Sequence, residues 1–254
     1  MTPIAEPPDD PTLPARYDEH AEAAPGEAEL AWYDAWLPRD RGSVLEVGCG
    51  VGRLTVPLAL RGHALHGADP SAARLDRCRA RLAATGAAAQ LHPQAPERLN
   101  LPMRYAAAFA GSCAFQRVTE PHAATVALER IRAHLIEPGL LAIDAFVPGF
   151  AAARPGAALF ELASVALDDG STIRRRSETE VDAEAPRVSC AHRYTRRRGS
   201  LALGEWRERV EWTWYEPGEL ADLVAGAGWR DVHVVDAPWP APRDGTHYAI
   251  VARA

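Results

Sequence analysis

A glycine-rich turn between a short apolar run and a helical pattern constrains this chain most. Residues 44–47 (Val-Leu-Glu-Val) read as a buried parallel strand, and three glycines follow at alternate positions from Gly48 to Gly52. Residues 54–60 can form the next helix, because Pro57 lies close enough to its start to be tolerated. Glycines let the backbone approach a ligand without a Cβ in the way, and a helix N-terminus offers unpaired N–H groups. The stretch therefore predicts a ligand-binding turn in an α/β fold.

An acidic residue follows the next predicted strand. Residues 63–68 read as that strand, Asp69 ends it, and a helical pattern begins after Pro70. An acid about 20 residues beyond a glycine turn can accept hydrogen bonds from both ribose hydroxyls of an adenosine. A nicotinamide oxidoreductase would place the third glycine of G-x-G-x-x-G at position 53, where this chain has Arg53. The spacing therefore disfavours that alternative.

The string E-x-G-x-G-x-G beginning at Glu46, followed by "LHGADPSAARLDRCR", resembles the first motifs of the class I S-adenosylmethionine-dependent methyltransferases. The resemblance covers about residues 15–148 and continues more weakly in "PGELADLVAGAGW" near the C-terminus. It implies a doubly wound, Rossmann-like α/β fold with a seven-stranded sheet whose last strand is antiparallel. It also implies S-adenosyl-L-methionine as cofactor and a small-molecule acceptor, in the setting of secondary metabolism.

The resemblance further implies which residues hold the cofactor. Glu46 and the glycine turn are expected at the methionine end, and Asp69 at the ribose. Gln94 stands where related sequences carry an acid that receives the adenine amino group, and its side-chain carbonyl can still accept that bond. The full set of cofactor candidates is Tyr17, Glu46, Gly48, Cys49, Gly50, Gly52, Arg53, Asp69, Pro70, Gln94, Ala95, Gly111 and Ser112.

Two departures keep another class of protein open. Besides Gln94, Ala106 replaces an aspartate that family members commonly carry near the start of the fourth strand. A non-catalytic protein that kept the fold and binds S-adenosylmethionine or a small molecule is therefore the alternative to an enzyme. Nucleic-acid methylation is a weaker one, because no N/D-P-P-Y string follows the fourth strand.

The chain divides into four segments. We expect a disordered tail rich in Pro and Asp, a cofactor-binding core, an antiparallel β insert forming a substrate wall, and a C-terminal helix with two strands that complete the core sheet. Their ranges are 1–14, 15–148, 149–216 and 217–254. Within the insert, period-2 alternation predicts three strands over 171–182, 187–196 and 203–215.

The predicted hairpin around Gly199 and Ser200 pairs His192 with Glu208 and Tyr194 with Trp206. On that register Glu208 could orient the His192 imidazole and raise its basicity, as a general base requires. A polar pair that braces the sheet is the competing interpretation. The substrate-binding candidates are Tyr17, Gln116, His192, Tyr194 and Trp214. Tyr17 could equally pin an N-terminal arm, and Gln116 could equally brace its loop.

Charge and cysteine usage exclude further classes. The formal net charge of −6 argues against a general nucleic-acid binder. The arginine runs 174–176 and 196–198 could receive an anionic substrate or a partner, or form solvated surface. The four cysteines form no C-x-x-C motif, so we expect reduced thiols. His63 and His66 have no further Cys or carboxylate partners at the spacing of metal ligands, so we expect no metal. No signal-peptide pattern or membrane-length apolar run is present, so a cytoplasmic location is expected. The oligomeric state stays open, with a homodimer as one option.

Overall fold

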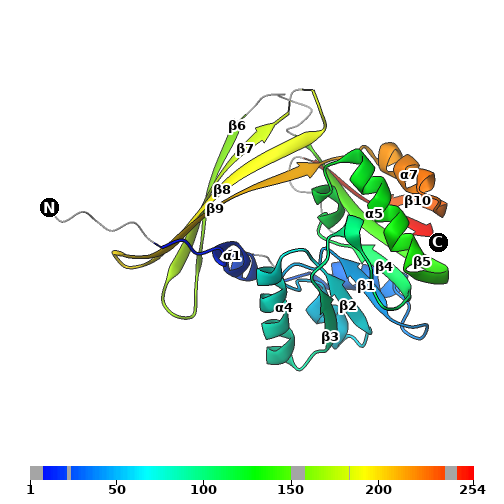
Figure 1. Ribbon diagram of the computed structural model, residues 1–254, viewed down its shortest axis with the longest axis horizontal. Helices are drawn as coiled ribbons and strands as arrows, with labels where there is room; N and C mark the ends of the chain where they lie inside the picture. The colour runs from blue at the N-terminus through cyan, green and yellow to red at the C-terminus, as the bar shows by residue number, and fades with distance from the viewer. Residues whose placement is uncertain (1–7, 22–23, 150–157, 183, 238–244) are drawn as a thin grey trace.

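The computed structural model describes residues 8–21, 24–149, 158–182, 184–237 and 245–254 (Figure 1). Seven strands form one mixed sheet in the order β10-β11-β5-β4-β1-β2-β3. The strands are β1 (Val44–Val47), β2 (Leu65–Ala68), β3 (Ala89–His92), β4 (Tyr105–Ala110), β5 (Leu135–Pro148), β10 (Arg230–Asp236) and β11 (Gly245–Arg253). Strands β1 to β5 pair in parallel, and β11 runs antiparallel to β5 and β10. The predicted doubly wound sheet with an antiparallel last strand is confirmed.

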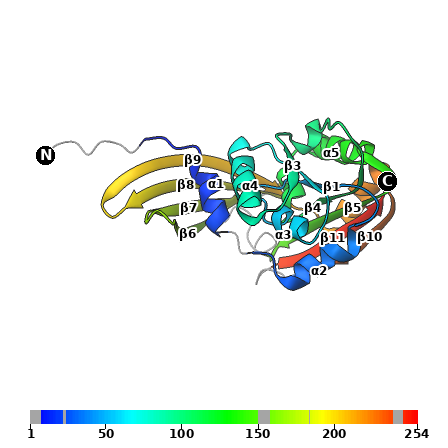
Figure 2. The same cartoon turned by 90° about the horizontal axis from the view of Figure 1, so that it is seen from below.

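Helices cover both faces of this sheet because its central strands are buried on both sides. Every residue of β1, β2 and β4 is buried, as their near-continuous apolar sequences require. One face packs on α5 (Pro121–Ala133) and α7 (Pro217–Gly226), and the other on α2 (Glu27–Trp36) and α3 (Thr55–Leu60), with α4 (Ala72–Thr85) beside α3 (Figure 2). Two short 3-10 turns, η1 (Pro96–Arg98) and η2 (Ala114–Arg117), follow β3 and β4.

The fifth strand begins earlier than its apolar run predicts. The sequence indicates a helix up to Leu135 and a strand from Leu140, whereas α5 ends at Ala133 and β5 starts at Leu135. Leu135 pairs with Tyr105, and the register shifts before Leu140 pairs with Ala107. Because the strand pairing is irregular here, the apolar pattern of the sequence does not predict the first residues of β5.

The insert forms a separate four-stranded antiparallel sheet in the order β6-β7-β8-β9. Its strands are β6 (Ala158–Ala166), β7 (Thr172–Val181), β8 (Arg187–Arg198) and β9 (Leu201–Thr213). The prediction of three strands is wrong by one, since β6 was missed. As an edge strand, β6 leaves Phe160 and Leu162 exposed on one face and Leu159 on the other, so its sequence shows no apolar and polar alternation.

The N-terminal helix α1 (Leu13–Ala21) lies between this sheet and α4 (Figure 1). Leu13 and Tyr17 pack with Ile173 and Tyr194 of the insert. Just before α1, Asp10 N–H donates to the carbonyl of Glu205 on β9 at 2.9 Å. The expectation of a disordered tail over 1–14 is therefore wrong from residue 8 onward, because backbone bonds to β9 order it, and residues 1–7 lie outside the described ranges.

The four cysteines are free thiols. Cys49, Cys78 and Cys190 are buried and Cys113 is partly buried. Burial raises the pKa of the Cys78 thiol to about 12 and raises those of the other three as well.

Candidate active site

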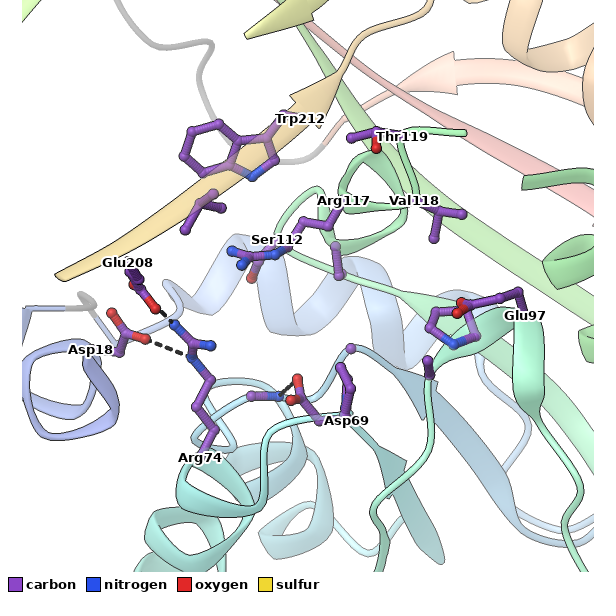
Figure 3. A pocket seen from close by; sticks show the side chains of 18 of the residues that line it. Asp18, Asp69, Arg74, Glu97, Ser112, Arg117, Val118, Thr119, Glu208 and Trp212 are labelled. Atoms are coloured by element: carbon purple, nitrogen blue, oxygen red, sulfur yellow. Dashed lines mark hydrogen bonds and ion pairs between the residues drawn. The ribbon is translucent and has the colours of Figure 1, made fainter. Parts of the chain in front are cut away.

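A cavity of about 660 Å³ opens at the carboxyl ends of the parallel strands, between the core and the insert. The turn after β1, the residues after β2 and β3 and the loop after β4 form its floor, and the inner face of the insert forms the opposite wall (Figure 3). Its lining includes the predicted residues Gly48, Gly50, Asp69, Pro70, Ala95, Gly111, Ser112, His192, Tyr194 and Glu208. We call it the core cavity.

Two glycines shape the floor. Gly48 has φ +80°, and a Cβ added there would lie 2.5 Å from the Cβ of Ala114. Gly50 has φ +53°, and an added Cβ would meet no atom within 4 Å. A side chain at Gly50 would therefore enter open space beside the cavity floor. The turn presents bare backbone to whatever occupies that space, and this fits the phosphate-free, adenosine-bearing ligand that the motif implies.

Asp69 lies beside this turn and is 8% exposed. One carboxylate oxygen accepts from Gly50 N–H at 3.0 Å and the other from Ser71 N–H at 2.8 Å. An ionised carboxylate has about four acceptor positions, so it can still bind two hydroxyl groups. The side chain is thus fixed by the backbone and faces the cavity.

Four of the cofactor candidates support the turn without lining the core cavity. Glu46 is buried and accepts a hydrogen bond from the Thr55 hydroxyl, which ties β1 to α3. Arg53 donates two bonds of 2.7 Å to Glu29 and one of 3.1 Å to Ser112. Cys49 and Gly52 face the interior, where an added Cβ at Gly52 would meet Cys78 Sγ at 2.5 Å.

Gln94 is turned toward its own loop. Its side-chain carbonyl accepts from Asn100 N–H at 2.7 Å and its amide donates to the Asn100 carbonyl at 3.3 Å. Both ends of the amide therefore close their own loop, and Gln94 does not line the core cavity. Ala95 and Glu97 do line it. The resemblance places an acid at position 94 and does not predict the carboxylate of Glu97.

Asp144 on β5 holds the loop after β4 and was not predicted. Its two oxygens accept from Ser112 N–H at 2.8 Å and Cys113 N–H at 2.7 Å, while both residues adopt positive φ. Burial raises the pKa of Asp144 to about 7, although the two N–H groups oppose that shift. The only sequence signal was an aspartate within an otherwise apolar strand.

A second cavity of about 400 Å³ lies further under the insert. It shares Ser112, Arg175, His192 and Trp212 with the core cavity, so the two are adjacent. Its other lining residues are Cys113, Gln116, Phe146, Pro148, Glu161, Ser177, Thr179, Val188, Cys190, Thr213 and Trp214. We call it the insert cavity.

Gln116 lies at the wall of the insert cavity as a brace. Its amide nitrogen donates to the carbonyls of Phe146 and Thr213, each at 2.9 Å, and its oxygen accepts from Phe146 N–H at 3.0 Å. It thereby joins the loop after β4 to β5 and β9. The loop-bracing alternative describes these contacts, while Trp214, another substrate-binding candidate, lines the same cavity.

The predicted pairing of His192 with Glu208 and of Tyr194 with Trp206 is confirmed. The expected increase in His192 basicity is contradicted. His192 Nδ1 lies 2.9 Å from Ser177 Oγ, whereas Glu208 accepts from the Tyr194 hydroxyl at 2.9 Å. Burial and the nearby Arg175 lower the pKa of His192 to about 4. The imidazole is therefore neutral at neutral pH, and its Nε2 makes no hydrogen bond to any described residue.

Glu208 instead belongs to an ionic contact that joins three elements. Arg74 on α4 donates to Asp18 of α1 at 2.8 Å and lies 3.8 Å from Glu208 of β9. Figure 3 shows the Arg74 side chain between the two carboxylates at the mouth of the core cavity. The sequence offered no sign of this contact, because Arg74 and Asp18 are 56 positions apart.

Tyr17, a candidate for contact with cofactor or substrate, lies behind the wall of the core cavity and does not line it. Its ring packs edge-on to Tyr194 at 5.6 Å, and the guanidinium of Arg175 lies 4.7 Å from its centroid. It anchors α1 on the insert, as the alternative interpretation held.

Within the described ranges, no three His, Cys, Asp or Glu side chains gather closely enough to hold a metal ion. No helix found there is both long and apolar enough to cross a bilayer.

Comparison with known proteins identifies the central segment. Residues 44–139 match the family model described as "Methyltransferase domain". No curated protein matches the chain by sequence.

Solved structures of similar fold cover nearly the whole chain. An S-adenosylmethionine-dependent methyltransferase from Clostridium acetobutylicum is 15% identical with a TM-score of 0.74, over 94% of this chain and 96% of that one. The sugar N-methyltransferase KedS8 from Streptoalloteichus sp is 18% identical with a TM-score of 0.72, over 100% and 96%. CalS10, an amino pentose methyltransferase from Micromonospora echinaspora, is 20% identical with a TM-score of 0.66, over 98% and 99%. At these identities the likeness shows a shared fold, insert included.

Proposed function

Because residues 44–139 of this chain match a methyltransferase domain, we propose that the protein transfers a methyl group from S-adenosylmethionine to a nitrogen or oxygen atom of a small molecule. The adjacency of the two cavities, which share four lining residues, carries the proposal. The core cavity takes S-adenosyl-L-methionine and the insert cavity takes the acceptor, and they meet at Ser112, His192 and Trp212. The names of KedS8 and CalS10 support a nitrogen acceptor on a sugar-like molecule.

In this proposal the cofactor is held mainly by backbone. The Gly48 and Gly50 turn and the loop at Ser112 border the methionine end, Asp69 receives the ribose hydroxyls, and the Ala95–Glu97 segment borders the adenine. Glu97 takes the part first given to Gln94, because its carboxylate lines the cavity. When bound, the cofactor supplies an electrophilic methyl group on a sulfonium centre.

The chain's own contribution is alignment. Holding the acceptor atom in line with the transferable methyl can lower the barrier by about 7–11 kcal/mol at most. Trp212 borders both cavities, and the guanidinium of Arg117 lies over its ring at 5.9 Å from the centroid. His192, neutral and open at Nε2, can accept a hydrogen bond from the acceptor. With a pKa of about 4, however, it is a weak general base.

The test is a transfer assay with the full chain. S-adenosylmethionine is incubated with a panel of small amines and alcohols, and formation of S-adenosylhomocysteine is measured. We expect turnover with a subset of the panel and tight binding of S-adenosylhomocysteine by calorimetry. A chain that fails to bind either form of the cofactor would contradict the proposal, and binding without transfer to any acceptor would favour the non-catalytic alternative.

A further inference from the structure

The insert cavity has an uneven distribution of charge. Phe146, Val188, Trp212 and Trp214 give it an apolar and aromatic lining. Among the described lining residues the charged side chains are Arg175 and Glu161, and the pair is asymmetric. The Arg175 side chain is 22% exposed and the Glu161 side chain is 62% exposed, so solvent screens the anion more than the cation.

Arg175 has unused hydrogen-bonding capacity. A guanidinium carries five N–H donors. Among the described residues Arg175 makes one hydrogen bond, from Nη2 to Glu161 at 3.1 Å, and its Nε is buried without a partner. Its plane is held by Tyr17, whose ring centroid lies 4.7 Å from Cζ. The group is thus fixed in orientation while most of its donors lack acceptors.

The position of Arg175 follows from strand alternation. On β7 it pairs with Tyr194 of β8, and both side chains lie on the face toward the core. Its neighbours Arg174 and Arg176 point to the opposite, exposed face, where Arg176 lies over Phe160. The central member of the arginine run is therefore the one that reaches the cavities. The lowered pKa of His192, to which Arg175 contributes, is consistent with positive potential at this point.

We propose that Arg175 selects acceptors that carry a carboxylate, which it binds in the insert cavity through the N–H groups of its two terminal nitrogens, Nη1 and Nη2. This inference rests on the proposed function, since it treats the insert cavity as the acceptor site. A carboxylate offers two oxygens that match the guanidinium fork, and the aromatic lining holds the apolar part of the same molecule. Arg175 then acts as a specificity-determining residue, with the atom to be methylated directed toward Ser112 and His192.

The test uses three probes that share a phenyl ring and differ in charge: phenylacetate, 2-phenylethanol and 2-phenylethylamine. The full chain is first saturated with S-adenosylhomocysteine, and probe binding is followed by calorimetry and by tryptophan fluorescence at neutral pH. We expect phenylacetate to bind about tenfold more tightly than the alcohol, with the amine weakest. In Arg175→Met the preference for phenylacetate should vanish, and in Arg176→Met it should remain.

Glu161→Gln provides a variant that gains binding. Glutamine can still accept from Nη2 of Arg175 but carries no charge, so phenylacetate no longer competes with an anion and should bind several-fold more tightly while S-adenosylhomocysteine affinity stays unchanged. Equal binding of the three probes, or equal losses in Arg175→Met and Arg176→Met, overturns the inference alone. Failure to bind S-adenosylhomocysteine at the saturation step overturns the proposed function, and the inference with it.

Discussion

Asp69 is the residue at which the proposed cofactor site is most directly tested. Its oxygens already hold the Gly50 and Ser71 amides, so the carboxylate is positioned before any ligand arrives. We expect Asp69→Asn to weaken S-adenosylhomocysteine binding by about ten- to a hundredfold, because a charged acceptor becomes a neutral amide. Calorimetry measures the change, with Asp76→Asn on exposed α4 surface as the control. Equal affinities in wild type and Asp69→Asn would remove Asp69 from the ribose site.

Substitutions of Gly48 and of Gly218 together test why the turn requires glycine. Alanine at this position requires an unfavourable φ of +80° and a clash with Ala114, so Gly48→Ala should lower the free energy of unfolding by about 1–3 kcal/mol. Gly218, early in α7, has open space around an added Cβ, so Gly218→Ala should be neutral or slightly stabilising. Urea unfolding of the two variants measures the difference, and equal midpoints would contradict this account of the turn.

At the scale of elements, ion pairs join α1 both to the insert and to α4. Arg16 lies 3.8 Å from Asp169 of the β6–β7 hairpin, Asp18 binds Arg74, and Glu19 binds Arg77 of α4. The helix therefore depends on partners in both the core and the insert. Because Asp18 lines the core cavity, any movement of α1 changes the cavity wall.

Replacing Arg74 should loosen this helix. In Arg74→Ala the contacts to Asp18 and Glu208 are both lost, so amide hydrogens of α1 should exchange about tenfold faster than in wild type. Arg79→Ala is the control, since Arg79 sits on the same helix and pairs with Asp76 at the surface. Hydrogen–deuterium exchange followed by mass spectrometry gives the comparison. Unchanged exchange in α1 would mean that hydrophobic packing of Leu13 and Tyr17 alone holds it.

Elements that depend on neighbouring residues could be predicted from the sequence. Helix α4 is capped at its N-terminus by Ser71, whose hydroxyl accepts from Arg74 N–H, and at its C-terminus by Gly86 with φ +72°. Both ends are therefore determined by residues next to them in the sequence. The β8–β9 register followed from one hairpin turn and two alternating strands. By contrast, the contact of Glu208 with Arg74 depends on where α4 packs against the insert, and strand alternation does not predict that position.

The same division applies to the site. The glycine turn and Asp69 were predictable because strand ends of a parallel sheet meet at one edge. The orientation of Gln94 could not be predicted, because the identity of a side chain does not reveal which backbone groups, here those of Asn100, will bind it. Asp144 was not predicted because its contacts with Ser112 and Cys113 form only after folding. For Arg175 the sequence singled out the run 174–176, and the structure shows which of the three side chains reaches the cavities.

For the whole molecule, buried histidines set the response of stability to acid. Burial lowers the pKa values of His66, His92 and His192 below the ordinary value near 6.5, so the unfolded chain binds more protons than the folded one in mildly acid solution. Their contribution to stability is present above about pH 6.5 and is lost as the pH falls toward 4. Asp144 acts in the opposite direction, because its raised pKa makes the folded state lose stability as the pH rises toward 7.

His192→Gln isolates one of these contributions. The variant should lose less stability than wild type between pH 6.5 and pH 4, by as much as about 3 kcal/mol. His122→Gln, at an exposed position of α5, should follow the wild-type curve. Unfolding free energies measured across this range give the answer, and parallel curves for His192→Gln and wild type would contradict the lowered pKa.

The thiols offer a way to watch the site open. Cys49 lies in the glycine turn and Cys113 in the loop after β4, and burial keeps both protonated and therefore slow to react. Cys49 is buried outside both cavities, so its alkylation requires the turn to open, whereas Cys113 and Cys190 line the insert cavity and their alkylation reports on access to it. Mass-spectrometric mapping of alkylated cysteines, with and without S-adenosylhomocysteine, would thus measure separately how readily each part of the site opens.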